Sequence, residues 1–284
     1  MIISASRRTD IPAFYAPWLL HRLREGYVLT RNPFNPAQAR RVGLTPEEVD
    51  CIAFWTKDPA PLLPLLDELD ALGYRYYFQF TLTPYGPELE RNLRPKEEIL
   101  RTFIELSGRL GPERVLWRYD PIILNDALSM DYHARKFQEL CGRLQGYTRI
   151  VTISFVDVYH KLKTPLVREI TDGEIAELSA VLANTAGEHG LDIRACCEAM
   201  DLRPYGIRPA SCIDRETVER LCGHAIDAKP DRNQRPGCGC LASVDIGAYN
   251  TCANGCVYCY ANYSEKSVER NRGRHDTRGE MMVT

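Results

Sequence analysis

The chain has 284 residues, of which 44% are hydrophobic and 26% charged, and its formal net charge is −2. This composition is typical of a globular protein, and the balanced charge excludes a global basic field that would draw the chain to nucleic acid or a membrane surface. No run of about 18 apolar residues is present, which argues against a membrane-spanning helix. The N-terminus carries no long apolar segment. We therefore expect a cytoplasmic protein without a signal peptide.

Short β-type runs recur along the chain, and helical stretches with apolar residues at i, i+3 and i+4 separate them. The predicted strands cover residues 2–5, 50–55, 76–82, 114–117, 149–155 and 191–195, with a weaker one at 242–246. The predicted helices cover residues 62–72, 96–110, 132–144 and 172–189, with a short one at 265–271. This alternation predicts an α/β fold with a largely parallel sheet. Repeated right-handed crossovers favour a partial or closed parallel (β/α) barrel, and an open doubly wound sheet is the alternative.

The composition of the chain changes near residue 227, where Cys, Gly, Asn and Arg replace the apolar periodicity. We therefore expect a (β/α) barrel core over residues 1–226. The Cys-rich segment over residues 227–284 would bind a cluster and close the barrel. Its polar tail, residues 264–284, is expected to form one short helix and then fray.

Polar side chains follow successive predicted strands, at the place where a barrel carries its active site. Arg7, Lys57, Thr81 and Arg118 all stand at such strand ends. Their recurrence predicts a polar, partly cationic rim. On this rim Arg7, Arg8, Lys57 and Arg118 could bind carboxylate or phosphate groups.

The histidines carry little functional signal. His160 follows a predicted strand end and is a candidate for contact with substrate. The histidines in helical stretches are expected at the surface or at helix ends; they are His21, His133 and His189.

Eleven cysteines in a chain expected in the cytoplasm need an explanation other than disulfides, and bound metal is the leading one. Three of them, Cys252, Cys256 and Cys259, lie within eight residues near the C-terminus. Three thiolates at this spacing can hold three irons of a [4Fe–4S] cluster and leave the fourth iron open to a ligand. The alternative is a tetrahedral zinc site that adds Cys238 or Cys240 as its fourth ligand.

A second group of cysteines lies before this triad: Cys196, Cys197, Cys212, Cys238 and Cys240. Four thiolates of this group, with Cys196, Cys212, Cys238 and Cys240 as the candidate set, could hold a second iron–sulfur cluster or a structural zinc ion. The alternative is that they are plain buried or redox-prone thiols. The cysteines in apolar-periodic stretches are expected to be core residues; they are Cys51, Cys141 and Cys222.

The triad carries a resemblance to a known superfamily. Its Cys-x3-Cys-x2-Cys spacing, with Tyr258 before the last cysteine, is similar to that of radical S-adenosylmethionine enzymes. In that superfamily the open iron binds the amino and carboxylate groups of S-adenosylmethionine, and the aromatic residue lies near the adenine. Over nearly its full length the chain also resembles an uncharacterised bacterial family, a domain of unknown function with such a cluster at its C-terminus. This second resemblance rests on ISASRRTDIP at 3–12, FWTK at 54–57 and the Cys-rich segment, and it implies no reaction.

A weaker resemblance links residues 50–124 to spore photoproduct lyase-like radical enzymes, through short motifs such as ERNLRP at 90–95 and RYDPII at 118–123. Two features depart from the superfamily. The cysteine loop normally follows the first strand but here comes last, and the usual Gly-Gly-Glu motif is missing. A circularly permuted barrel would explain both. The strand at 242–246 would then pair in parallel with the strand at 2–5, and the loop at 6–8 would take the place of the missing motif.

The resemblance implies a radical S-adenosylmethionine enzyme, a lyase or oxidoreductase, that generates a 5′-deoxyadenosyl radical and acts on an unknown substrate. The expected cofactors are a [4Fe–4S] cluster on the triad and S-adenosylmethionine, with a flavodoxin or ferredoxin as electron donor. Cofactor contacts are expected from Tyr258, Ser6, Arg8 and Thr81, and catalytic roles from Arg7, Lys57 and Arg118. No membrane partner is expected, and the acidic balance does not favour a nucleic-acid substrate. The alternative function is a non-enzymatic iron–sulfur or zinc-binding protein on the same scaffold.

Overall fold

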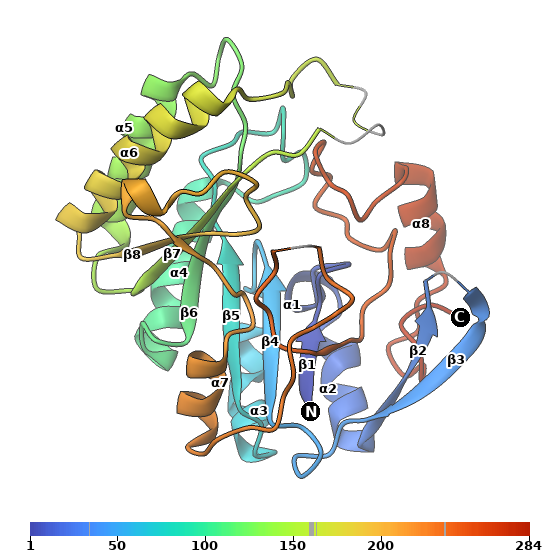
Figure 1. Cartoon of the computed structure of the whole chain (residues 1–284). Helices are drawn as coiled ribbons and strands as arrows, with labels where there is room; N and C mark the ends of the chain where they lie inside the picture. The colour runs from blue at the N-terminus through green and yellow to red at the C-terminus, as the bar shows by residue number, and fades with distance from the viewer. Residues whose placement is uncertain (34, 159–161, 163, 236) are drawn as a thin grey trace.

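The centre of the molecule is a large parallel sheet. The computed structural model describes residues 1–33, 35–158, 162, 164–235 and 237–284. Eight strands run in the order β10-β1-β4-β5-β6-β7-β8-β9, and each neighbouring pair is parallel (Figure 1). These strands are β1 (Ile2–Ala5), β4 (Cys51–Thr56), β5 (Tyr76–Thr81), β6 (Val115–Ile122), β7 (Ile150–Phe155), β8 (Asp192–Ala195), β9 (Arg208–Pro209) and β10 (Val244–Asp245). Within the described residues the end strands β10 and β9 do not pair with each other, so hydrogen bonding leaves the sheet open.

Helices connect the strands, as parallel pairing requires. They are α1 (Ile11–Phe14), α2 (Ala16–Glu25), η1 (Leu63–Leu65), α3 (Leu66–Ala71), α4 (Lys96–Leu110), α5 (Met130–Leu144), α6 (Asp172–Glu188), η2 (Arg203–Tyr205), α7 (Arg215–Cys222) and α8 (Glu265–Gly273). The sequence signals at their ends explain several boundaries. Helix α6 begins with a capping box between Thr171 and Glu174, and α5 begins at the cap Ser129. No helix among the described residues is long and apolar enough to cross a membrane.

The two faces of the sheet have different partners, because successive residues of a strand point to opposite sides. On one face Phe54, Phe78 and Trp117 join the main hydrophobic core together with α2, α4, α5 and α6. On the other face the first residues of the strands, among them Ile2 and Tyr77, pack against α7 and the loops around it.

Further along this second face, the strands change from apolar to polar. In β6 the buried Leu116 is followed two residues later by Arg118, and in β5 the buried Tyr77 is followed by Gln79. The apolar half of the face is therefore filled by α7, and the polar half lies at the C-terminal ends of the strands. This division places the site at that edge.

The last strand pairs with the first, as the permutation hypothesis predicts. Ile3 lies opposite Val244 and Ser4 opposite Asp245 in a parallel register. Gly247, just past β10, packs so closely on the loop after β1 that a Cβ atom there would lie 2.6 Å from the Cβ of Ser6. The predicted pairing of these two segments is confirmed.

The segment between β1 and β4 contains an antiparallel hairpin that the sequence pattern did not reveal. It consists of β2 (Tyr27–Asn32) and β3 (Asn35–Gly43). The hairpin lies beside α8 and the C-terminus (Figure 1). The backbone N–H of Leu29 donates to the carbonyl oxygen of Glu280 at 2.8 Å, and Met282 is buried. The tail therefore packs against the hairpin, and the expectation that it frays was wrong.

The structure describes His133, which was expected at the surface or at a helix end. It lies near the start of α5 but is fully buried under β6, where its Nδ1 contacts the hydroxyl of Tyr119 at 2.7 Å. Burial lowers the pKa of His133 to about 4, although a hydrogen bond to the carbonyl of Ile123 acts in the opposite direction. His160 lies outside the described residues.

Three cysteines were expected in the core. Cys51, Cys141 and Cys222 are buried as core residues, as expected.

Candidate functional site

A cavity of about 490 Å³ opens over the C-terminal ends of the strands. Apart from His160, which lies outside the described residues, the site residues predicted from the sequence all line this one cavity: Ser6, Arg7, Arg8, Lys57, Thr81, Arg118, Cys196, Cys212, Cys238, Cys240, Cys252, Cys256, Tyr258 and Cys259. The structure therefore brings the two cysteine groups and the strand-end rim together. The chemical roles of these residues remain predictions.

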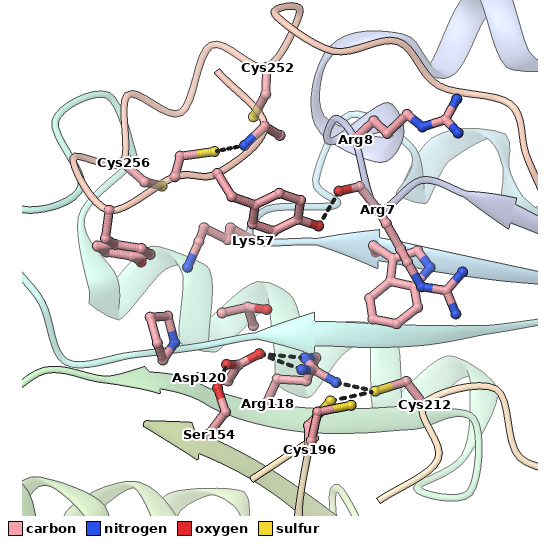
Figure 2. Close-up of a pocket in the computed structure, with 18 of the residues that line it drawn as sticks. Arg7, Arg8, Lys57, Arg118, Asp120, Ser154, Cys196, Cys212, Cys252 and Cys256 are labelled. Carbon is pink, nitrogen blue, oxygen red and sulfur yellow. Dashed lines mark hydrogen bonds and ion pairs between the residues drawn. The ribbon is translucent and has the colours of Figure 1, made fainter. Parts of the chain in front are cut away.

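The two cysteine groups occupy opposite walls of the cavity. Figure 2 shows Cys252 and Cys256 on one side and Cys196 and Cys212 on the other. Lys57, Arg7 and Arg118 lie between them. Cationic side chains therefore occupy the space that separates the two sets of sulfurs.

The triad loop, residues 252–259, is held by hydrogen bonds on two sides. The amide of Asn92 donates to the carbonyl of Ala253 at 2.8 Å, and a short antiparallel bridge joins Glu90 to Cys256. On the other side, the amide of Asn254 donates to the buried carboxylate of Asp10 at 3.1 Å.

Gly255 permits the turn inside the triad loop. Its φ is +68°, a left-handed conformation that costs a residue with a Cβ atom about 1–2 kcal/mol. An added Cβ would also lie 2.8 Å from the side-chain nitrogen of Asn92. A glycine at this position therefore lets the loop bend between its first two cysteines.

Glu90 is a buried carboxylate at the centre of this wall, and its side chain has no exposed surface. Lys57 donates to it at 2.7 Å, Thr83 donates at 2.9 Å, and Lys96 and Tyr258 also contact it. Burial acts to raise the pKa of Glu90, but the two lysines outweigh it and hold the pKa at about 2. Glu90 is therefore ionised, and it fixes both the Lys57 ammonium and the ring of Tyr258 beside the triad.

The triad thiols lie in a desolvated part of the cavity wall. Desolvation raises the pKa of all three, and that of Cys256 to about 12. The charges of Cys256 and Cys259 act in the same direction on Cys252. Thiolates in this position therefore require a nearby cation for their stability. Among the residues that the structure describes, no three His, Cys, Asp or Glu side chains are arranged to hold a single metal ion.

Arg118 is a buried cation whose hydrogen bonds are already committed. Its Nε donates to Asp120 at 3.0 Å, and its Nη1 donates to the sulfur of Cys212 at 2.8 Å. Asp120 also accepts a hydrogen bond from Ser154. Desolvation opposes the charge on Arg118, but Asp120 outweighs it and raises the pKa well above the ordinary value. Arg118 is therefore charged, and its hydrogen bonds link Asp120 on β6 to Cys212 in the second cysteine group.

Three buried hydrogen-bonding groups on residues that line the cavity lack partners within the described residues: Nη2 of Arg7, Nε1 of Trp55 and the hydroxyl of Thr9. The Arg7 guanidinium lies over the Trp55 ring, 4.8 Å from its centroid. Nη1 of Arg7 donates to Ser243 at 3.2 Å and holds the guanidinium in this position. Buried donors without partners are rare in folded proteins, and they indicate a place where a ligand could accept.

Asp245, on β10, organises the loop after β1. Its carboxylate accepts from the hydroxyl of Ser6 at 2.7 Å and from the backbone N–H of Arg7 at 2.8 Å. The Arg8 guanidinium reaches the carbonyl of Gly247 at 3.4 Å. The contact between the chain's last and first strands thus sets the position of the loop at 6–8.

Sequence reasoning missed the carboxylates that position this site. Asp245 lies in a strand predicted only weakly, and Glu90 lies in a loop whose burial no periodicity indicates. The motif ERNLRP at 90–95 includes Glu90, but nothing in it indicates that this carboxylate is buried. Charge pairing of this kind is visible only when the segments are assembled.

Comparison with known proteins adds one match. A family model described as "Domain of unknown function (DUF1848)" matches residues 2–261. The match includes β1, β10 and the whole triad loop. No curated protein matches the chain.

Proposed function

For this chain, which belongs to the DUF1848 family, we propose the function of a radical S-adenosylmethionine enzyme that acts on an anionic substrate. The observation that carries the proposal is the position of the Cys-x3-Cys-x2-Cys triad. Its three thiols line the same cavity as the strand-end side chains. A radical source must lie close to the bond on which it acts, and this arrangement meets that requirement.

The donor set fits a [4Fe–4S] cluster. Each thiolate of such a cluster binds its own iron atom, so the triad need not converge on a single ion. Three desolvated thiols beside Lys57 are a setting in which an iron cluster would supply the missing positive charge. When bound, the cluster and S-adenosylmethionine supply an electron and a 5′-deoxyadenosyl radical that removes a hydrogen atom from the substrate.

The chain's own residues position these groups. Cys252, Cys256 and Cys259 would be the ligands, and Asp10 holds their loop through Asn254. The hydrogen bond between Tyr258 and Glu90 fixes the tyrosine ring at the cavity wall. In this orientation the ring could pack on the adenine.

The remaining cofactor contacts come from strand ends. Ser6 and Arg8 lie in the loop that Asp245 organises, and Thr81 ends β5. In a permuted barrel, β10 corresponds to the first strand of the superfamily. The loop at 6–8 then stands where the missing glycine-rich motif would bind the amino group of S-adenosylmethionine.

The substrate side of the cavity favours an anion. Lys57 is paired with Glu90, and Arg118 with Asp120. By contrast, Arg7 Nη2 and Trp55 Nε1 are buried donors without acceptors in the described chain. A carboxylate or phosphate oxygen of the substrate would satisfy both, and a charge-assisted bond to Arg7 would orient it.

The experiment is anaerobic purification and reconstitution with iron and sulfide, followed by reduction in the presence of S-adenosylmethionine. We expect cluster absorbance and the formation of 5′-deoxyadenosine. The variant Cys252→Ala/Cys256→Ala/Cys259→Ala should lose about four irons per chain and all cleavage. Unchanged iron and sulfide in this variant would contradict the ligand assignment. A cluster that never cleaves S-adenosylmethionine would favour the non-enzymatic alternative, and bound zinc would favour the zinc-binding one.

A further inference from the structure

The second cysteine group forms a continuous surface, which we call the thiol wall: Cys196, Cys197, Cys212, Cys238 and Cys240. All five line the cavity opposite the triad. They come from three separate places in the chain. One pair follows β8, one residue precedes α7, and one pair precedes β10. Folding therefore gathers thiols that lie up to 44 positions apart in the sequence, from 196 to 240.

The sulfurs of the thiol wall form an unbroken chain of contacts. The Sγ atoms of Cys196 and Cys212 are 3.5 Å apart. Cys212 also hydrogen-bonds to Cys240. In the other direction Cys196 contacts Cys197, and Cys197 contacts Cys238. By contrast, the core cysteine Cys141 lies singly among apolar residues.

The backbone is shaped to bring these thiols together. The N–H of Cys196 donates to the carbonyl of Ile153 at 2.9 Å, which extends the register of β8 by one residue. The N–H of Leu241 donates to the carbonyl of Ile213 at 2.9 Å and joins the loops that carry Cys240 and Cys212. Gly239 lets these loops touch, since a Cβ there would lie 2.4 Å from the hydroxyl oxygen of Ser211.

Cys197 has a strained backbone. Its φ of +56° is left-handed, although it is not a glycine. Strain of this kind costs about 1–3 kcal/mol and persists where the surroundings impose it, often at functional sites. Here it turns two adjacent cysteines toward the same wall.

Positive charge faces the thiol wall. Arg118 donates to Cys212 at 2.8 Å, and the guanidinium of Arg7 hydrogen-bonds to Cys240. Figure 2 shows Arg118 reaching Cys212 beside Cys196. A cluster with four thiolate ligands carries net negative charge, which Arg7 would offset, and Arg118, although paired with Asp120, donates a hydrogen bond to one of the ligands.

We propose that the thiol wall supplies four ligands to a second iron–sulfur cluster, on the opposite side of the cavity from the triad. Cysteine thiolates are the usual ligands of such clusters, and four hold all the irons of one. Each thiol would lose its proton as it binds iron. The thiols must rotate apart from their present contacts to bind separate irons.

The proposal does not depend on the triad, so the two sites can be tested separately. Wild-type protein reconstituted with iron and sulfide should hold about eight irons per chain, and the triple-alanine triad variant about four. The wall variant Cys196→Ser/Cys212→Ser/Cys240→Ser should also hold about four irons and keep the triad cluster. Cys141→Ser, a buried core cysteine, is the control and should keep the wild-type iron content.

A second measurement covers the case in which the wall variant fails to fold. In the triad variant, alkylation of the wall thiols by N-ethylmaleimide should slow after reconstitution with iron and sulfide, and a chelator should reverse this. A triad variant without iron, whose wall thiols react equally with and without reconstitution, would overturn the proposal. Zinc in place of iron at the wall would overturn it as well. Neither result depends on whether S-adenosylmethionine is cleaved.

Discussion

The triad loop and the thiol wall face one cavity, but they are held in place in different ways. The triad is a single stretch of eight residues, and contacts of its loop with Asp10, Glu90 and Asn92 position it. The wall comes from three distant segments, and its sulfurs contact one another. The geometry of the triad therefore depends on the conformation of one loop. The geometry of the thiol wall depends on three segments meeting at the same edge of the sheet.

The largest expected effect on stability comes from Glu90, which lies behind the triad loop. Glu90→Ala would leave the buried ammonium groups of Lys57 and Lys96 without a counter-charge. Removing one partner of a buried ion pair costs about 3–5 kcal/mol, and urea unfolding of the protein without iron would measure this. Glu97→Ala, which breaks an exposed pair with Arg143, is the control and should change little. Equal effects of the two variants would contradict the role given to Glu90.

A smaller and more local effect is expected at Gly255. Gly255→Ala would strain the left-handed turn by about 1–2 kcal/mol and push Asn92 aside. In the wall variant, where only the triad is expected to hold iron, adding Gly255→Ala should speed the loss of that iron to a chelator. Gly273→Ala, at the end of α8 where an added Cβ meets nothing within 4 Å, should not change iron retention. A Gly255→Ala protein that retains iron as the wild type does would show that the loop needs no such turn.

A further expected effect, spread over several pH units, is a pH dependence that separates two carboxylates beside the triad. Burial raises the pKa of Asp10 to about 6, although hydrogen bonds from Lys57 and Asn254 act to lower it. The folded state then keeps a proton that the unfolded state releases, so this contribution to stability falls as pH rises from about 4 to about 6. Glu90 behaves in the opposite way. Its contribution is present above about pH 4.5 and is lost as pH falls toward about 2, because the pKa is lowered on folding.

The measurement is the free energy of unfolding between about pH 4 and pH 7 in protein without iron, for wild type and Asp10→Asn. The difference between the two proteins should vary with pH through this window, because Asn cannot titrate. Parallel curves for the two proteins would contradict the raised pKa of Asp10.

The parts of the fold that the sequence predicted are those with strong local patterns. The helix expected at 96–110 coincides with α4, and the strand expected at 2–5 coincides with β1. The hairpin of β2 and β3 was missed because its strands are rich in Arg, Thr and Asn and lack an alternating apolar pattern. Its stability comes from contacts with α2 and the C-terminal tail, which no local pattern encodes.

The sequence also predicted part of the candidate site. The triad could be identified because its three cysteines are neighbours in the chain. The wall cysteines could be named, but their order of contact depends on the loops around β8, α7 and β10 meeting at one edge. The pairing of Arg118 with Asp120 could have been predicted, because residues two apart on a strand share a face. The burial of His133 depends on how α5 packs on the sheet, which no local pattern encodes.

The most direct test of the central claim is whether the triad holds a cluster with an iron open to S-adenosylmethionine. The wall variant isolates that cluster, and electron paramagnetic resonance of the reduced protein reports its ligands. We expect that adding S-adenosylmethionine labelled with ¹⁵N at its amine changes the spectrum and produces a nitrogen coupling to the cluster. The same addition to the triad variant should produce no coupling. If the signal of the reduced wall variant does not change when S-adenosylmethionine is added, the cluster on the triad has no iron open to S-adenosylmethionine.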